Sequence, residues 1–310
     1  MNKLISICLI LILAIGTLSS CNPSPAEENP TEELEFHLLT DGTYGVSAGN
    51  AKEFEKIVIP ATYNDKAVTK IMDKAFFEAK NIKSITVPDS ITSIGEYAFA
   101  ECSNLTNLTI GNGVTFVGDS AFHNCHKLNY NKYENGYYLG NKTNPHVVLA
   151  FANVALAEKT TEFIINDATK IIHFAAFHEY RSLKSITIPD GVTCIGAGAF
   201  SYCDSLTSIT IPDSVTSLGK SAFNRCENLK SVKIGNGVTK INMTVFLNCS
   251  KLEVVELPGG ITNIEESAFC NCSNLRSIIF NGTEAEWNDI IKVDLWDQNA
   301  NNYTVTYAGQ

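Results

Sequence analysis

The chain has 310 residues, of which 45% are hydrophobic and 18% are charged, and its formal net charge at pH 7 is -10. This composition excludes an intrinsically disordered chain, and 20 glycines with 9 prolines are too few for a collagen-like or linker-dominated protein. An acidic chain with 23 Lys and Arg residues also argues against a nucleic-acid partner, because phosphate backbones are bound by clustered basic side chains. The length accommodates one or two globular domains.

The first segment, residues 1–20, has the features of an export signal. Lys3 is its only charged side chain, and an almost unbroken apolar run follows from Leu4 to Leu18. This run is shorter than the roughly 20 residues that span a bilayer, and it has the length of the apolar region of a secretory signal peptide. We therefore expect an exported protein.

The signal ends in Leu18-Ser19-Ser20-Cys21, which resembles the lipobox of bacterial lipoproteins. The resemblance implies that Cys21 is diacylated and becomes the mature N-terminus, and two or three acyl chains hold a protein stably at a membrane. A conventional secretory signal with an incidental cysteine is the alternative. Residues 21–33 are rich in proline and glutamate, a composition typical of a flexible tether.

The next segment, residues 34–56, is expected to form an N-terminal cap. Apolar and polar residues alternate around Asp41-Gly42, a pair that favours the tight turn of a hairpin. A cap is needed because the segment that follows is repetitive, and the end of a repeat stack exposes both core side chains and an unpaired strand edge.

Phenylalanine recurs every 23 residues over residues 57–280, with one gap of 55. Three residues after most of these phenylalanines stands a cysteine, and one repeat, Leu206–Asn228, reads L-x-x-I-x-I-P-D-x-V-T-x-I-G-x-x-A-F-x-x-C-x-x. A period in the twenties with this spacing predicts a leucine-rich-repeat solenoid. We expect an α/β-type repeat solenoid, mostly β and right-handed, with about eight 23-residue coils. The repeated phenylalanines are Phe76, Phe99, Phe122, Phe177, Phe200, Phe223, Phe246 and Phe269.

The gap of 55 residues places an insertion at 129–161. Its sequence predicts two strands around an Asn/Pro turn, and we expect a hairpin that projects from the stack. Because insertions within a repeat often mark the binding side of a solenoid, Tyr133, Tyr137 and Tyr138 are candidate contact residues. The alternative is that these aromatic side chains pack on the neighbouring coils. At the other end, residues 281–310 are expected to form a C-terminal cap in which both tryptophans plug the core.

The sequence predicts neither a metal site nor a catalytic site. Cysteines three residues after the repeated phenylalanines would stack in one column within disulfide range, but their side chains should all point into the core, so we expect inert, buried thiols rather than disulfides. His123 and His178 would be neighbours if the insertion loops out, but exposed turn histidines are much commoner than a metal pair. No motif of a hydrolase, metalloprotease or P-loop enzyme is present, so we predict no enzyme and no cofactor.

The outward side chains of the main strands form the candidate binding face. Their alternation predicts two flat lanes of small, largely uncharged residues, suited to broad contact with a protein or a glycan. Hydroxyl residues are also good exposed strand formers, so the lanes have a purely structural explanation too. The candidate residues are Ser84, Thr86, Asn107, Thr109, Ser185, Thr187, Ser208, Thr210, Lys233 and Glu256.

The repeat resembles that of the BspA-like bacterial leucine-rich-repeat proteins. The resemblance rests on Ser208–Gly219 with Ala222-Phe223 and Cys226, and it covers residues 57–280. It implies an exported surface protein, often a lipoprotein, that binds host matrix proteins or other cells and has no catalytic residues. The coil of Phe177 departs from the pattern with Thr169, His173 and Tyr180 in place of valine, glycine and cysteine.

We therefore expect a bacterial lipoprotein, anchored in a membrane through its lipid and exposed at the cell surface or outer membrane. Its expected role is a non-catalytic scaffold for adhesion or protein–protein interaction, with a protein of the host matrix or of another cell as partner. A carbohydrate-binding surface module and a purely structural envelope protein are the alternatives.

Overall fold

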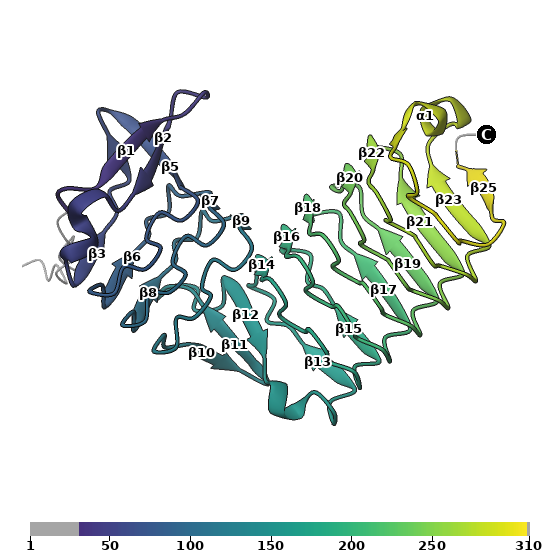
Figure 1. Cartoon of the computed structure of the whole chain (residues 1–310), viewed down its shortest axis with the longest axis horizontal. Helices are drawn as coiled ribbons and strands as arrows, with labels where there is room; N and C mark the ends of the chain where they lie inside the picture. The colour runs from purple at the N-terminus through teal and green to yellow at the C-terminus, as the bar shows by residue number, and fades with distance from the viewer. Residues whose placement is uncertain (1–30, 309–310) are drawn as a thin grey trace, which may run out of the picture.

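The computed structural model describes residues 31–308, which wind into a β-solenoid (Figure 1). The predicted solenoid fold is confirmed: the chain makes about 11 turns with a spacing of about 23 residues. The turns outnumber the expected eight because the caps and the insertion complete turns of their own. Within the described range, no helix combines the length and apolar character needed to cross a membrane. The signal peptide, Cys21 and most of the predicted tether lie outside the described residues.

The longer strand of each turn stacks in parallel on the strand 23 residues away. Ser208 pairs with Ser231, and Ser231 with Val254. This register keeps every repeat position in one column, as the sequence period predicts. The strands form three sheets: β3 (Lys56–Val58), β6 (Ser84–Thr86) and β8 (Asn107–Thr109); β13 (Glu162–Ile164) and β15 (Ser185–Thr187); and β17 (Ser208–Ile211), β19 (Ser231–Ile234), β21 (Val254–Pro258), β23 (Ser277–Asn281) and β25 (Thr304–Tyr307).

The shorter strands form a second set of ladders, which lies along the inner side of the V seen in Figure 1. A glycine follows four of these eight strands, because there the preceding turn lies too close for a side chain. A Cβ atom on Gly219, for example, would stand 2.3 Å from the backbone nitrogen of Ala197. The shorter strands are β7 (Ser93–Ile94), β9 (Phe116–Val117), β14 (Ile171–Ile172), β16 (Cys194–Ile195), β18 (Ser217–Leu218), β20 (Lys240–Ile241), β22 (Asn263–Ile264) and β24 (Ile291–Lys292).

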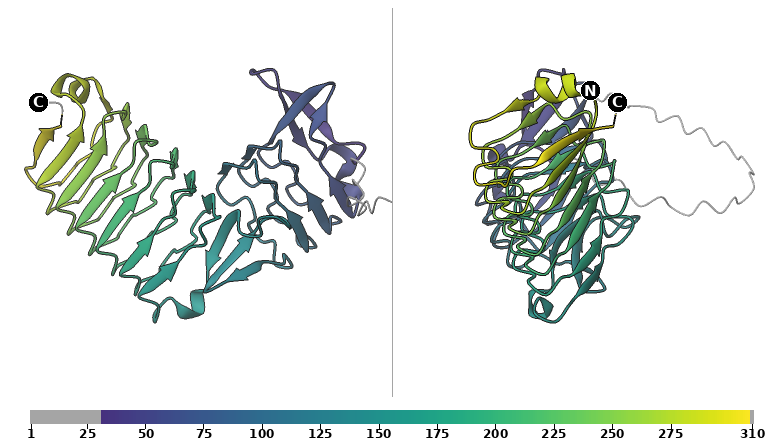
Figure 2. Two further views of the ribbon diagram at one scale, coloured as in Figure 1. Left: turned by 180° about the vertical axis from the view of Figure 1, so that it is seen from behind. Right: turned by 90° about the vertical axis from the view of Figure 1, so that its right-hand side faces the viewer.

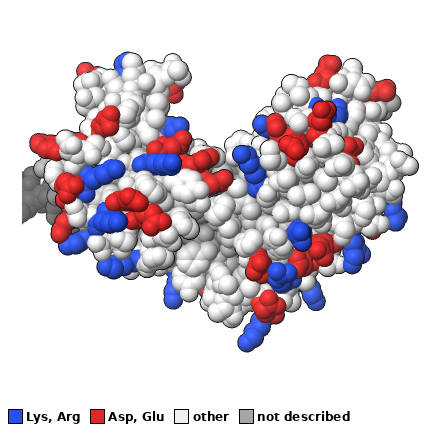
Figure 3. Space-filling model, in the orientation of Figure 1, with Lys and Arg blue, Asp and Glu red and all other residues white. Residues whose placement is uncertain are grey.

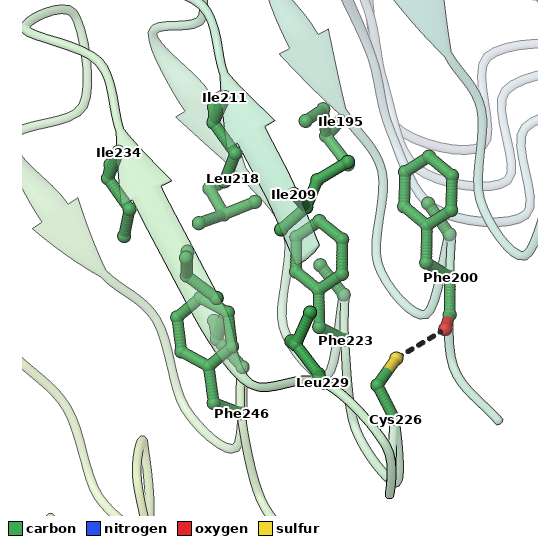
Figure 4. Close-up of a cluster of buried hydrophobic side chains, with 14 of the residues drawn as sticks. Ile195, Phe200, Ile209, Ile211, Leu218, Phe223, Cys226, Leu229, Ile234 and Phe246 are labelled. Atoms are coloured by element: carbon green, nitrogen blue, oxygen red, sulfur yellow. Dashed lines mark hydrogen bonds between the residues drawn. The ribbon is translucent and has the colours of Figure 1, made fainter. Parts of the chain in front are cut away.

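The repeated phenylalanines stack inside the solenoid in two separate files. In the first file the ring centroids of Phe76 and Phe99 are 5.5 Å apart, and Phe122 follows at 5.9 Å. The second file runs from Phe177 to Phe269 with separations of 5.0, 5.2, 5.6 and 5.2 Å (Figure 4). Each file is the centre of its own hydrophobic core.

The repeated cysteines have a defined structural role in these cores. The thiol of Cys226 donates to the carbonyl oxygen of Phe200 in the preceding turn at 3.2 Å (Figure 4). Cys102, Cys125, Cys203, Cys249 and Cys272 make the same bond, at 3.0 to 3.3 Å. All described cysteines are free and buried, as expected. The thiol is therefore a second donor to a buried carbonyl, because the Phe200 carbonyl also accepts the backbone amide of Cys203 at 3.2 Å.

Both ends of the solenoid are covered. At the N-terminus β1 (Glu35–Leu38) and β2 (Tyr44–Ser47) form an antiparallel hairpin, followed by the 3-10 helix η1 (Gly49–Glu53) and by β4 (Thr62–Tyr63), which pairs with β5 (Lys66–Ile71). Thr31 was expected to belong to the flexible tether. Its amide instead donates to the Val58 carbonyl at 2.9 Å and so ties it to the first turn. At the C-terminus the helix α1 (Glu284–Asp289) begins with a capping box at Thr283, and Trp296 packs edge-on against Phe269 at 5.9 Å.

The insertion does not project from the stack, contrary to the expectation. It forms β10 (Asn131–Tyr133), β11 (Gly136–Leu139), β12 (Val148–Ala152) and the 3-10 helix η2 (Val154–Leu156), and β12 pairs in parallel with β14. Its residues Leu139, Val147 and Val148 belong to the first core, whereas Tyr138 and Leu149 belong to the second. Removing apolar side chains from water is what favours this placement over a projecting hairpin.

The inserted segment bends the molecule. One sheet ends at β9 and the next begins at β10, so within residues 31–308 no ladder of strands crosses the junction. The N-terminal arm (residues 31–128) and the C-terminal arm (residues 162–308) diverge from this junction as a V, with the insertion at its vertex (Figures 1 and 2). We call this vertex, residues 129–161 with the turns that contact them, the elbow.

Candidate interaction surfaces

The two predicted lanes exist on the long-strand face but are interrupted. In the C-terminal arm Thr210 pairs with Lys233 and Lys233 with Glu256, and in the N-terminal arm Ser84 pairs with Asn107 and Thr86 with Thr109. β8 and β15 belong to different sheets because the elbow separates them, so the candidate residues form one short and one longer patch. Ser185, Thr187, Ser208 and Thr210 are exposed, whereas Ser84, Thr86 and Thr109 are half-buried.

The longer patch offers little charge for recognition. The only charged pair among the candidate residues, Lys233 and Glu256, forms an ion pair with 2.9 Å between Nζ and Oε1. The hydrogen bond from the Asn281 amide, and then that from Lys233, lower the pKa of Glu256. In Figure 3 the C-terminal arm presents a broad uncharged expanse with charged side chains gathered along its margins. Steering of a partner by charge is therefore weak on this patch.

In the coil of Phe177, the departures from the repeat at His173 and Tyr180 lie at the elbow. His173 stands where most other coils have glycine, and it has room because β12, rather than another coil, precedes it. Tyr180 stands in the cysteine column, and its hydroxyl donates to the carbonyl of Asn153 in the insertion at 3.3 Å. Thr169 is fully buried. The sequence around Phe177 is thus fitted to the insertion, which explains why it breaks the pattern.

His173 joins the two arms. Its ring lies 5.0 Å from that of Phe122, the last phenylalanine of the first file. Complete burial lowers the pKa of His173 to about 4, opposed by a hydrogen bond to the backbone of Gly118, so the imidazole is neutral at pH 7. Its Nε2 atom is buried and has no hydrogen-bond partner, and such an unpaired group costs free energy in the folded state.

A cavity of about 120 Å³ opens at the elbow beside His173. Phe122, Tyr130, Phe151 and Phe174 supply its aromatic walls. A cavity of 150 Å³ in another protein holds benzene, so this one is large enough for a single apolar side chain of a partner. Phe174 is 38% exposed, which leaves the aromatic wall accessible from solvent.

The aromatic surface extends from the cavity across the insertion. Tyr137 stacks on Phe151 with 4.7 Å between ring centroids, Tyr130 meets Phe151 edge-on at 4.9 Å, and the Lys132 ammonium lies 5.2 Å from the centre of the Tyr137 ring. We call Tyr130, Tyr137, Phe151 and Phe174 the elbow cluster.

Only one of the three tyrosines named from the sequence belongs to this cluster. Tyr137 does, but Tyr138 is fully buried and Tyr133 packs against the core of the C-terminal arm. Phe151 and Phe174 were missed because a projecting hairpin would have left them apart. The signal that locates them is the break in the repeat at His173.

The turns that carry His123 and His178 do not stack on each other. A pair of these histidines would require the turn of Phe122 to stack on that of Phe177. Instead Phe122 faces His173, and Phe177 packs on Phe163 with 4.7 Å between centroids. Among residues 31–308 no group of three or more His, Cys, Asp or Glu side chains is placed to hold a metal ion.

Comparison with known proteins supports the fold and the repeat. A family model described as "BspA type Leucine rich repeat region" matches in six copies over residues 49–143 and 150–289. A leucine-rich-repeat protein from Eubacterium ventriosum is similar in structure, with 19% identity, a TM-score of 0.50 and coverage of 88% of this chain and 94% of that chain. No curated protein sequence matches the chain.

Two further solved structures resemble the chain less closely in superposition. The pneumococcal vaccine antigen PcpA has 15% identity and a TM-score of 0.40, and the match covers 90% of this chain and 98% of that chain. A leucine-rich-repeat protein from Bacteroides ovatus has 19% identity and a TM-score of 0.35, with 90% and 100% covered.

Proposed function

Because the chain belongs to the family of bacterial proteins with BspA-type leucine-rich repeats, we propose that it is a cell-surface scaffold that binds other proteins. Leucine-rich-repeat proteins typically act as non-catalytic scaffolds for protein–protein interaction. The partner is a protein of the host matrix or of another cell surface. Export and an acylated Cys21 would hold the scaffold at the membrane, with residues 22–30 as a spacer.

The elbow cluster is the observation that supports this function best. Binding energy in protein interfaces is concentrated in a few aromatic or arginine side chains near the centre of the contact. The lanes of Ser and Thr lack such residues, whereas the elbow offers four aromatic side chains around a cavity of about 120 Å³. We therefore propose the elbow as the centre of the protein-binding surface and the lanes as its periphery.

The test measures binding of the purified chain to a panel of immobilised extracellular-matrix proteins and to whole bacterial cells. Tyr137→Ser and Phe174→Ser each remove an accessible ring of the elbow cluster, and the loss of one central aromatic is expected to weaken binding by about tenfold or more. Tyr63→Ser is the matched control, because Tyr63 is 38% exposed, stacks on Phe36 with 3.9 Å between ring centroids and lies in the N-terminal cap, outside the turns that line the cavity.

The outcomes separate the competing functions. Binding that is lost with both elbow variants and kept with Tyr63→Ser supports the proposal. Equal binding by all variants removes the elbow from the interface and leaves the strand lanes as the candidate. A chain that binds nothing in the panel and no cells favours a purely structural envelope protein. Separately, lipid labelling of bacteria that is unchanged by Cys21→Ala would contradict the anchor.

A further inference from the structure

A polar groove on the C-terminal arm lies apart from the elbow and the lanes. Its volume is about 440 Å³, and its walls come from consecutive turns of the chain just after the phenylalanine file. The turns of Asn248, Asn271 and Asn299 contribute amide or hydroxyl side chains, and the first turn contributes Arg225 and Glu227. Its walls include Arg225, Asn248, Ser250, Asn271, Ser273 and Asn299.

The three asparagines are linked in a ladder along the groove. The side-chain amide of Asn271 donates to Oδ1 of Asn248 at 2.8 Å, and that of Asn299 donates to Oδ1 of Asn271 at 2.9 Å. A carboxamide can donate two hydrogen bonds and accept two. The ladder uses one donor and one acceptor of Asn271, so half of its capacity remains for a ligand.

Backbone conformation does not account for the asparagines. Asn248 and Asn271 have φ values of 61° and 59°, in the left-handed region that favours asparagine. The same turn position has a φ of 63° at Glu101, 58° at Glu179 and 61° at Tyr202. Because glutamate and tyrosine adopt this conformation elsewhere in the chain, the turn permits asparagine at this position but does not require it.

One end of the groove carries a guanidinium group that is held in place. Arg225 lies 5.4 Å from the centre of the Tyr202 ring, and Arg181 lies 5.7 Å from it. Within residues 31–308, Arg225 has no carboxylate within ion-pair distance, so its N–H groups remain available as donors. Glu227 also lines the groove and leaves it without net charge.

We propose that this groove binds an extended, neutral oligosaccharide. Amide, hydroxyl and guanidinium groups are complementary to sugar hydroxyls, and the balanced charge does not favour a polyanion. Successive turns are about 4.8 Å apart, close to the advance per sugar of an extended β-linked pyranose chain, so each sugar lies opposite one turn and successive sugars present alternate edges to the ladder. An extended peptide advances about 3.4 Å per residue and does not match this spacing.

The test titrates the purified chain with cellohexaose, chitohexaose and maltohexaose, and follows binding by calorimetry. The first two are extended β-linked chains and the third is a curved α-linked one. Asn271→Glu removes the central amide, and the fold tolerates glutamate at this turn position, as Glu101 and Glu179 show. Asn124→Glu is the matched control, because Asn124 occupies the same position in the N-terminal arm, outside the groove.

We expect at least one extended hexamer to bind, and Asn271→Glu to weaken that binding about tenfold while Asn124→Glu leaves it unchanged. Three results overturn the proposal: neither extended hexamer binds, maltohexaose binds equally well, or Asn271→Glu binds like the control. The protein-binding panel is run on the same variants. It should be unaffected by Asn271→Glu, so the failure of one site is distinguished from the failure of the other.

Discussion

The ring of His173 lies 5.0 Å from that of Phe122 and thereby connects the cores of the two arms. The imidazole is buried at this contact in its neutral form, because burial lowers the pKa of His173 to about 4. Between pH 6.5 and 4 the unfolded chain binds a proton at this residue and the folded chain does not. Stability is therefore expected to fall as the pH drops through this window, and to be unaffected by His173 above it.

This pH dependence can be measured by urea unfolding at pH 7 and pH 4.5. His173 is expected to change the free energy of unfolding by an amount on the order of 3 kcal/mol over its full window, and His173→Leu should remove that part of the pH dependence. His126→Leu, at an exposed turn, is the control and should keep the pH dependence of the parent. An unchanged pH dependence in His173→Leu would show that the buried imidazole is not the group responsible.

Gly219, which follows the short strand β18, should be intolerant of any side chain. Gly219→Ala places Cβ 2.3 Å from the backbone of Ala197, and forcing the turns apart should cost about 3 kcal/mol. Gly260→Ala is the matched control, because no atom lies within 4 Å of its Cβ position, and its stability should stay within about 0.5 kcal/mol of the parent. Thermal melting of both variants tests this, and equal melting temperatures would contradict the close approach of the turns.

The cysteine column should contribute to stability through its hydrogen bonds. Cys226→Ala removes the thiol donor to the Phe200 carbonyl, which keeps the backbone amide of Cys203 as a partner, and the lost bond is expected to cost about 0.5–1.5 kcal/mol. Cys270 is off the column, and Cys270→Ala should cost less. Chemical unfolding of the two variants measures the difference, and a larger loss for Cys270→Ala would argue against the thiol bonds.

The same thiols should be unreactive in the folded chain. Burial raises the pKa of Cys102 to about 11 and that of Cys125 to about 12, so at pH 8 only a minute fraction is thiolate, the reactive form. Labelling with a thiol-specific chromogenic reagent should be slow in the native protein and fast in urea. Rapid native labelling would indicate that the turns open far more readily than their packing implies.

Removal of the insertion should destroy the fold rather than straighten it. Tyr138, Val148 and Leu149 are fully buried, and the coil of Phe177 is fitted to them through His173 and Tyr180. A chain without residues 129–161 is expected to lose cooperative unfolding by circular dichroism, whereas Tyr137→Ser keeps it. A compact, cooperative deletion variant would show that the arms can stack directly.

The repeat period predicted most of this architecture. It placed each Phe and Cys in its column and gave the strand register that pairs Ser208 with Ser231. These features follow from local spacing alone, because every turn repeats the same contacts with its neighbours. The lanes of the strand face were predictable for the same reason.

The elbow was not predictable from spacing. A 55-residue gap fits both a projecting hairpin and an inserted pair of strands, and the choice depends on how much apolar surface the neighbouring coils leave uncovered. The substitutions Thr169, His173 and Tyr180 were visible as irregularities, but their meaning depends on contacts with β12 and with Asn153. The groove asparagines were likewise hidden within an ordinary turn position.

The thiol-to-carbonyl bond has an evolutionary consequence. Every regular turn supplies a donor to the turn before it and an acceptor to the turn after it, so copying one 23-residue unit of the gene adds a turn whose two faces already fit. The junction at His173 has no such self-complementarity. Length variants among close relatives should therefore gain or lose whole units within either arm and preserve the vertex unchanged.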